Sequence, residues 1–576
     1  MGNVFTATAS SRGFTVKAYS GDRCAMLAFD LADHLTDKLA GFAIRRKPAS
    51  GPDSSWTWLG NRLSFDGDYT KAGGKFFPSN VAPFQKFWWL DFPSGDVQGT
   101  FCYEVVVKRF VQDKSGQLQD DQTVQVTVDV GPFVEGGIEV AFTRGYLSSQ
   151  AYADEFDNKP YEPKVPTGQW KFDWTPYEAQ WAWLGAHARA AIEGFLTECY
   201  QDPNATVDAF VYDLNEPAII TAFIELAGMG KLRMLADDAK LHAEGTAAAK
   251  AFADIQAAAT DATRDGFMRG KFKRYQHNKV LIKKIDGVAQ KVLTGSTNYS
   301  ITGLYVNANH VLVFDDQAVA ANYEEAFETA LNDKLQAADF YEQEISTQEF
   351  PIDRPGMPPI VVSFAPHRDP QVGLKRLLNA IDDAGSSVIF AVMDLNGSGE
   401  VLKALSQLHT NQKVFSYGIS DSVNPEDDTV DGTTVFTPAT KGGELVYSKA
   451  NPEKFPPPFS MEREVQGPAA HIVHHKFVVV DFNGTNPVVF GGSSNLAEGG
   501  ERSNGDNLVA IYDRAIATAF AIEGIRLVDH YAFAAALKKA GTSGQALRLK
   551  FDGEKWWSRY YTAGDIREKE RMLFSR

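Results

Sequence analysis

The sequence predicts an α/β protein in which an N-terminal β-sandwich precedes two similar α/β repeats that pack as one pseudo-twofold unit. Three observations lead to this prediction. The first part of the chain is a series of short strand-like segments, strands and helices alternate after about residue 136, and several motifs recur at a nearly constant spacing. At 576 residues the chain is too long for one core, so we divide it into residues 1–135, 136–350 and 351–576.

Composition and charge narrow the class of protein. Apolar residues make up 44% of the chain and aromatic residues 12%, as in folded globular proteins. No apolar stretch approaches the roughly 20 residues that cross a bilayer, and the first residues lack the features of a signal peptide. The 57 basic and 73 acidic residues give a net charge of −16, which disfavours nucleic acid as a partner. We therefore expect a monomeric, cytoplasmic protein whose contact with membranes is peripheral.

The first 135 residues have the pattern of an antiparallel β domain. Segments rich in aromatic and β-branched residues, such as FCYEVVVKRFV at 101–111 and QTVQVTVDV at 122–130, are separated by turn-forming Gly, Pro, Asp and Ser. Long helical patterns are missing from this part of the sequence. Strands at this spacing predict a β-sandwich.

After residue 136 the pattern changes to alternating strands and helices. IEVAF at 138–142 predicts a strand, residues 178–196 a helix and VDAFVYDL at 207–214 another strand. The later half repeats this order, with a strand at 360–365, a helix at 371–385 and a strand at 386–395. Such alternation is typical of α/β domains.

Several motifs occur once in each half. Asp213-Leu-Asn recurs 181 positions later as Asp394-Leu-Asn, and Asn309-His-Val-Leu-Val-Phe-Asp resembles Asn507-Leu-Val-Ala-Ile-Tyr-Asp at a spacing of 198. Two further motifs recur at a spacing of 197: His-x-Lys at His277/Lys279 and His474/Lys476, and Gly-Ser-x-Asn at Gly295/Ser296/Asn298 and Gly492/Ser493/Asn495. Chance similarity would not keep these groups in order, so the halves are duplicated.

The residue types in these motifs suit chemistry on an anion. In a strand, His474 and Lys476 point to the same face, whereas His475 points to the other. Imidazole can act as nucleophile, acid or base near neutral pH, and ammonium and amide groups stabilise developing negative charge. By contrast, His310, His471 and His475 lack the support of the repeat, so we interpret them as structural residues.

The doubled HxKxxxxD and Gly-Ser-x-Asn pattern resembles the phospholipase D superfamily, whose members hydrolyse or exchange phosphodiesters. The resemblance covers about residues 136–576. The second copy holds the full motif, with Asp481 as its aspartate. The first copy departs from it, because Lys284 stands at the aspartate position and the nearest acid is Asp286. A shift of two residues keeps Asp286 on the same strand face, about 7 Å farther along.

The resemblance implies a phosphodiesterase that works through a phosphohistidine. It implies that His277 attacks phosphorus and His474 protonates the leaving group, although the symmetry of the motifs leaves the two roles interchangeable. Lysines and asparagines would stabilise the phosphoryl oxygens, serines would donate to these oxygens or hold the histidines, and these cationic groups would make a metal or other cofactor unnecessary. The predicted catalytic set is His277, Lys279, His474, Lys476, Asn298, Asn495, Asp481, Ser296, Ser493 and Asp286.

The substrate and the activity stay open in part. A phospholipid or another small phosphodiester is the expected substrate, with water or an alcohol as acceptor. A nuclease of the same superfamily and a non-catalytic phosphate-binding protein are the alternatives. The Pro- and Gly-rich segment between about residues 420 and 470 is typical of a lid or a connector. The aromatic stretch WWSRYY at 556–561 favours core packing over a ligand pocket.

Overall fold

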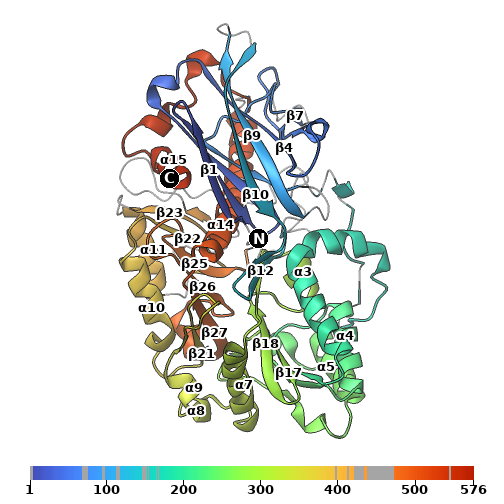
Figure 1. Cartoon of the computed structure of the whole chain (residues 1–576). Helices are drawn as coiled ribbons and strands as arrows, with labels where there is room; N and C mark the ends of the chain where they lie inside the picture. Colours follow the sequence, from blue (N-terminus) through green and yellow to red (C-terminus); the bar gives the residue numbers. More distant parts are fainter. Residues whose placement is uncertain are drawn as a thin grey trace.

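The computed structural model shows an N-terminal β-sandwich standing on a pair of α/β repeats (Figure 1). The structure describes residues 4–67, 76–93, 98–111, 117–145, 152, 155–157, 159–163, 165–166, 168–395, 399–410, 414–420, 434–436, 473–543 and 546–576. The Pro- and Gly-rich segment proposed as a lid therefore lies almost entirely outside the described residues, as does His471.

Two antiparallel sheets form the sandwich predicted from the first 135 residues. One has the order β1 (Thr6–Ser11), β2 (Phe14–Gly21), β3 (Cys24–Leu31), β8 (Trp88–Asp91). The other has the order β10 (Leu118–Val130), β9 (Gly99–Phe110), β4 (Leu39–Pro48), β5 (Thr57–Trp58), and β6 (Gly60–Asn61) pairs with β7 (Phe77–Pro78) beside them. Alternate residues such as Val16, Val105 and Val126 enter a shared core, as the period of two requires.

The first repeat is built on a mixed sheet. Its strands lie in the order β11 (Phe133–Glu135), β12 (Ile138–Phe142), β19 (His310–Phe314), β18 (Val288–Gly295), β17 (Val280–Ile285), β13 (Ala205–Val211), β14 (Leu232–Ala236), β15 (Phe267–Arg269). Its helices are α3 (Glu178–Gln201), α4 (Pro217–Gly228), α5 (Ala247–Ala258), α6 (Ile301–Tyr305) and α7 (Gln317–Asn332).

The second repeat follows the same plan. Its sheet has the order β20 (Phe350–Ile352), β21 (Ile360–Ala365), β27 (Asn504–Ile511), β26 (Val488–Gly492), β25 (Lys476–Val480), β22 (Ser387–Val392), β23 (Phe415–Ser420), β24 (Thr434–Phe436). The helices from the end of the first repeat onward are α8 (Ala337–Phe340), α9 (Glu344–Thr347), α10 (Gln371–Asp382), α11 (Glu400–Thr410), α13 (Glu498–Glu501), α14 (Arg514–Ser543) and α15 (Ile566–Ser575). Matching strand orders confirm the duplication.

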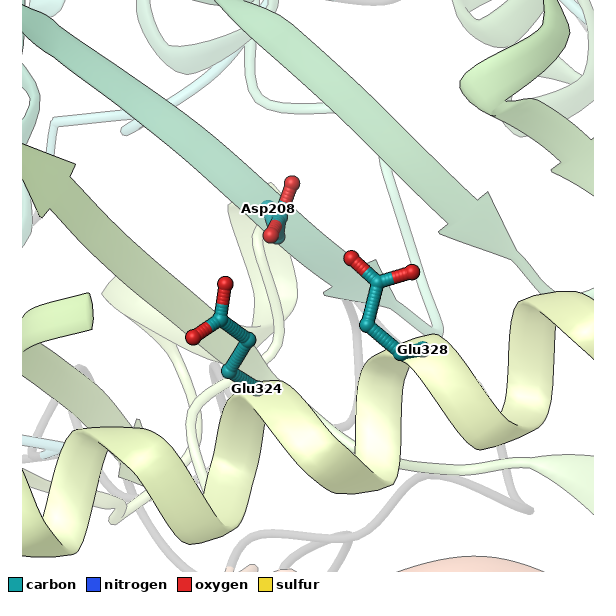
Figure 2. A group of neighbouring side chains, drawn as sticks. All are labelled: Asp208, Glu324 and Glu328. Carbon is teal, nitrogen blue, oxygen red and sulfur yellow. The ribbon is translucent and has the colours of Figure 1, made fainter. Parts of the chain in front are cut away.

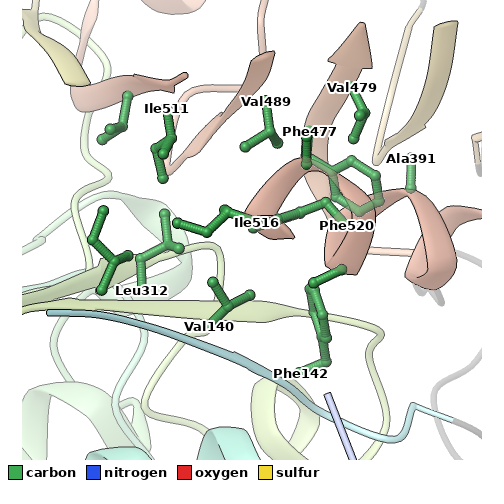
Figure 3. Packing of buried hydrophobic residues seen from close by; sticks show 14 of the residues in the cluster. Val140, Phe142, Leu312, Ala391, Phe477, Val479, Val489, Ile511, Ile516 and Phe520 are labelled. Carbon is green, nitrogen blue, oxygen red and sulfur yellow. The ribbon is translucent and has the colours of Figure 1, made fainter. Parts of the chain in front are cut away.

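Each sheet of the two repeats has two apolar faces, so its central strands are continuous hydrophobic runs. In β25, Phe477 and Val479 face the space between the two sheets, while Val478 and Val480 pack with the apolar side chains of α10 and α11. Figure 3 shows how α14 fills the space between the sheets, with Phe520 among residues of both repeats. Burying each such phenylalanine contributes about 1.5–3 kcal/mol.

The C-terminal residues return to the sandwich, and α15 packs between it and the second repeat. Trp556 and Tyr560 belong to the sandwich core, and the Trp556 indole N–H donates to the carbonyl of Leu39 at 2.9 Å. The Tyr19 hydroxyl donates to the carbonyl of Phe574 at 2.6 Å. Core packing of the 556–561 aromatics is thereby confirmed. Among the described helices, none combines the length and the apolar character needed to cross a bilayer.

Candidate active site at the seam between the repeats

The two histidine–lysine motifs lie where the repeats meet. His277 follows β16 (Tyr275–Gln276), which pairs in parallel with β27 of the other repeat, and its N–H donates to the carbonyl of Gly505 at 2.8 Å. His474 donates its N–H to the carbonyl of Ala308, at 3.0 Å. Both histidines are buried, with exposed fractions of 4% and 7%. Each is therefore held in place by the main chain of the opposite repeat.

A side chain of the opposite repeat orients each imidazole. The Nδ1 atom of His277 lies 2.7 Å from Oδ1 of Asp506, and Nδ1 of His474 lies 2.8 Å from Oδ1 of Asn309. A carboxylate and an amide oxygen can only accept, so each ring carries its proton on Nδ1 and leaves Nε2 for chemistry. The two imidazoles thus share a geometry but differ in the charge of their partner.

These two partners correct one alignment made from the sequence. The sequence pairs Asn309 with Asn507 at a spacing of 198. In the structure, Ser296 N–H donates to the carbonyl of His310, and Ser493 N–H donates in the same way to Asn507. His310 therefore corresponds to Asn507, and Asn309 to Asp506, at 506 − 309 = 197. The sequence alignment paired Asn309 with Asn507 because both are asparagines. The spacing of 197, which the histidines and glycines share, pairs Asn309 with Asp506 and would have identified both partners.

The lysines lie beside the histidines of their own motifs. Lys279 and Lys476 each donate from Nζ to the carbonyl of that histidine, and Lys476 Nζ also lies 3.3 Å from both ring nitrogens of His474. Burial lowers the pKa of Lys279 to about 7, although nearby aspartates oppose it. The Tyr212 ring, which the sequence analysis missed, lies 4.5 Å from Lys279 Nζ and 4.6 Å from the His277 ring. It directly precedes the repeated Asp-Leu-Asn, which was the available signal.

The His277 ring is neutral at physiological pH. Burial and the positive charge of Lys279 lower its pKa to about 4, and the effect outweighs the opposing carboxylate of Asp506. A neutral imidazole with Nδ1–H bound to a carboxylate presents a lone pair on Nε2. This is the form that a nucleophile requires.

In the Gly-Ser-x-Asn motif, the glycine is required for steric reasons and the serine holds a neighbouring side chain in place. A Cβ on Gly295 would lie 2.3 Å from the carbonyl oxygen of His310, and one on Gly492 would lie 2.5 Å from that of Asn507. Their φ angles are +142° and +137°, a region that favours glycine. Ser296 Oγ donates to Asn309 Oδ1 at 2.8 Å, so it holds the residue that orients His474.

The two asparagines of this motif, Asn298 and Asn495, follow the serines at the ends of β18 and β26. Asn298 is buried and Asn495 is half-buried. Within the described part of the chain, the Oδ1 atom of each has no hydrogen-bond partner. Such a buried amide, not fully satisfied by the protein, is suited to meeting a polar ligand.

The two aspartates of the predicted set lie away from the imidazoles. Asp481 accepts hydrogen bonds from the N–H groups of Gly385, Ser386 and Ser387 at 2.7–2.9 Å, so it anchors the loop before β22. Asp286 is exposed at the turn between β17 and β18, with φ of +49°. Its placement on the face of the histidine is therefore corrected, because the strand ends at residue 285. The first copy has Lys284 in place of the motif aspartate, but His277 loses no hydrogen-bond partner by this exchange.

Lys284 belongs to an ion-pair cluster instead. Figure 2 shows Asp208 on β13 facing Glu324 and Glu328 on α7. Within the described part of the chain, these three carboxylates have oxygen atoms close enough together to hold a metal ion. Lys284 lies 2.9 Å from Asp208 and 3.2 Å from Glu324, while Arg233 lies 2.7 Å from Asp208 and 2.5 Å from Glu328. Lys284 and Arg233 already form ion pairs with these carboxylates, so the cluster fits a metal ion poorly.

Behind the motif histidines lies a second pair of imidazoles. His310 and His475 stack with their Nδ1 atoms 3.3 Å apart, and His310 Nδ1 lies 3.2 Å from Ser296 Oγ. His475 Nε2 lies 3.0 Å from Glu523 on α14. Both rings are fully buried and have hydrogen-bond partners, which is consistent with their interpretation as structural residues. They connect the site to α14.

A family model described as "Cardiolipin synthase, PLD-like domain" matches residues 197–331 and 377–528. Each matched segment contains one histidine–lysine motif. No curated protein matches the sequence.

Solved structures of three other proteins are similar to parts of this one. Phosphatidylserine synthase from Haemophilus influenzae is 12% identical with a TM-score of 0.40, and the alignment covers 68% of this chain and 94% of that one. The phospholipase D family member Nuc from Salmonella typhimurium is 19% identical with a TM-score of 0.20, over 24% of this chain and 86% of that one. Yeast tyrosyl-DNA phosphodiesterase is 10% identical with a TM-score of 0.30, over 56% and 85%.

Proposed function

This chain belongs to the phospholipase D superfamily, and on that premise we propose that it cleaves phosphodiester bonds of phospholipids through a phosphohistidine intermediate. The observation that carries the proposal is a reciprocal arrangement of the two repeats. Each repeat supplies one imidazole, and the opposite repeat supplies the side chain that orients it, at 2.7 Å for His277 and 2.8 Å for His474. Two oriented imidazoles at one seam are what a two-step displacement at phosphorus needs.

In the first step Nε2 of His277 attacks phosphorus. The P–N bond forms as the bond between phosphorus and the leaving alkoxide breaks. The proton on Nε2 of His474 passes to the alkoxide, which leaves as an alcohol. A bound phosphodiester is an anion, and its charge favours the protonated form of His474 that this step uses.

In the second step a water molecule or an alcohol attacks the same phosphorus. Nε2 of His474, now neutral, takes the proton of the attacking group. The P–N bond breaks and His277 returns to its starting form. Water gives hydrolysis and an alcohol gives transfer of the phosphoryl group, so both activities use the same residues.

The charged partners support the assignment of roles. Attack makes the His277 ring positive, and the carboxylate of Asp506 stabilises that charge. Asn309 offers His474 a neutral oxygen, so His474 receives no such charge from its partner. Lys279, Lys476, Asn298 and Asn495 would donate to the non-bridging oxygens as their charge develops.

Two considerations support a phospholipid as the substrate. The net charge of −16 opposes the sequence-independent attraction on which nucleases depend. The matching family model describes cardiolipin synthase, a name that refers to a phospholipid. A nuclease of the same superfamily is the alternative within the enzymes, and a protein that only binds phosphate is the alternative outside them.

The proposal is tested with purified protein, a chelator, and three substrates: phosphatidylcholine, phosphatidylglycerol and single-stranded DNA. We expect release of head group from at least one lipid, no cleavage of DNA, and no loss of activity with chelator. In the presence of ethanol, a phosphatidylethanol product would reveal the transfer reaction. Cleavage of DNA alone would establish the nuclease instead.

Substitutions separate catalysis from binding. His277→Ala and His474→Ala are each expected to abolish turnover, while His530→Ala, at a half-buried histidine of α14 away from the site, serves as a matched control. A chain that binds phosphodiesters but turns none over, with or without these substitutions, would be a phosphate-binding protein.

A further inference from the structure

A cavity away from the histidine–lysine motifs lies where the sandwich, the first repeat and α14 meet. Its empty space of about 680 Å³ includes solvent at its open side. The sandwich contributes Asp22 and Arg23, the first repeat contributes Arg144, and α14 contributes Glu523 and Arg526. Figure 1 shows α14 passing from between the repeats to the sandwich, so the cavity sits at the junction of all three parts.

The acidic residues of this cavity are already engaged. Asp22 lies 2.6 Å from Nδ1 of His187 and accepts the N–H of Phe142 at 3.0 Å. Burial lowers the pKa of His187, but Asp22 and Glu139 outweigh it and raise the pKa to about 9, so this imidazole is positive and matches the Asp22 charge.

Glu523 is engaged as well. Its Oε1 atom lies 2.6 Å from Arg526 and 3.0 Å from Nε2 of His475. The lining therefore brings three guanidinium groups together with two carboxylates, of which Asp22 is shared with the His187 imidazolium and Glu523 pairs with Arg526 itself.

The arginines repel one another. Burial and the charges of Arg526 and Arg23 lower the pKa of Arg144 to about 10. Its guanidinium lies 4.3 Å from the Trp183 ring centroid, a contact that leaves the fork of N–H donors available to a planar or tetrahedral acceptor. Like charges in a partly buried cavity are costly, and an anion among them would remove that cost.

The backbone at the cavity wall is strained. Ala186 interrupts α3 with φ of +45° and ψ of −131°, a region that non-glycine residues avoid at a cost of about 1–3 kcal/mol. The break directs His187, the next residue, toward Asp22. Strain of this kind persists where the surrounding structure shapes a functional site.

We propose that the cavity between Arg23, Arg144 and Arg526 is a binding site for a small tetrahedral oxyanion, either inorganic phosphate or the phosphate of a phosphomonoester. Arginine is the side chain best matched to phosphate oxygens, because its planar fork donates two hydrogen bonds at once. Bound there, the anion would tie the sandwich to both repeats. The site does not depend on the proposed function, since it shares no residue with the histidine–lysine motifs.

The cavity is linked to the seam by hydrogen bonds. Glu523 contacts His475, His475 contacts His310, and His310 contacts Ser296. Ser296 in turn holds Asn309, which orients His474. An anion that draws Arg526 away from Glu523 changes the first contact in this series of hydrogen bonds. Occupancy of the cavity is therefore expected to alter turnover as well as stability.

The test measures phosphate binding by calorimetry in the full chain carrying Lys476→Gln, which weakens phosphate binding at the seam. Saturable binding of inorganic phosphate is expected to remain, and Arg144→Gln added to this background is expected to weaken it at least tenfold. Arg23→Gln is the second variant, should Arg144→Gln fail to fold. Arg368→Gln, at an exposed arginine elsewhere, is the matched control and should leave binding unchanged.

Two further arms identify the source of the phosphate. Glycerol 3-phosphate is compared with inorganic phosphate, and vesicles of phosphatidic acid are compared with vesicles of phosphatidylcholine. Binding of the soluble anions identifies a free ligand, and binding only to phosphatidic acid vesicles that is lost in Arg144→Gln identifies a lipid phosphate. Absence of binding in the Lys476→Gln chain in all arms, or binding unchanged by Arg144→Gln and Arg23→Gln, would overturn the proposal.

Discussion

His277 in the first repeat and Asp506 in the second form a hydrogen bond of 2.7 Å between Nδ1 and Oδ1. The equivalent contact on the other side joins His474 to Asn309 at 2.8 Å. The duplication is thus symmetric in geometry and asymmetric in charge. This difference is the physical basis for giving the two imidazoles different roles.

Replacing Asp506 by Asn tests the charge of this contact. The amide oxygen can still accept the Nδ1 proton, but it cannot stabilise a positive ring. We expect kcat to fall by roughly 10²–10⁴-fold with the fold retained. Asp513→Asn is the control, because Asp513 caps α14 through the N–H of Ile516 at 2.8 Å and Asn caps helices equally well. Equal activity of Asp506→Asn and the wild type would remove Asp506 from the account.

The pH dependence of kcat/KM follows from two lowered pKa values. Neutral His277 is available above its pKa of about 4, so activity should rise through that pH. Lys279 loses its charge above its pKa of about 7, so binding of an anionic substrate should weaken there. Lys279→Arg keeps the positive charge and should move the upper limb of the profile to higher pH. An upper limb that stays in place in this variant would assign it to another group.

Asp481 should matter for stability and not for chemistry. Burial raises the pKa of Asp481, but hydrogen bonds from Gly385, Ser387 and Ser386 outweigh it and lower the pKa below its usual value. A lowered folded pKa gives stability that is present above about pH 4 and is lost as the pH falls through the folded value.

Asp481→Asn should therefore reduce the free energy of unfolding by about 1 kcal/mol at pH 7, and by less in acid. Urea unfolding at several pH values measures this difference. Asp286→Asn, at the exposed turn, should change neither stability nor kcat. A large loss of kcat in either variant at unchanged stability would return these carboxylates to the catalytic set.

Restoring the motif with Lys284→Asp should harm the protein. The new carboxylate would face Asp208, which is 1% exposed, and Glu324 without the cation that joins them. We expect a loss of about 3 kcal/mol in the free energy of unfolding, measured in urea. Lys284→Arg, which keeps the charge, should stay close to the wild type. A stable and more active Lys284→Asp chain would contradict this account of the cluster.

The sequence predicted the sandwich, the duplicated α/β repeats and the residues of both histidine–lysine motifs, because hydrophobic periodicity and repeated spacing are local signals. The reciprocal partners were missed, since the side chain that orients His277 lies 229 residues away in sequence and only the fold brings it close. Asp286 was misplaced because period-two alternation was continued past the end of β17, where the chain turns. The cavity at Arg144 joins three parts of the chain and has no sequence motif.

The covalent intermediate tests the central claim most directly. Full-length protein is mixed with substrate, quenched within one turnover in alkali, which preserves phosphorus–nitrogen bonds, and digested for mass spectrometry. The account predicts the phosphoryl group of the substrate on the peptide that carries His277. A group found on His474 instead would reverse the two roles, and turnover with both histidines unmodified would contradict the mechanism.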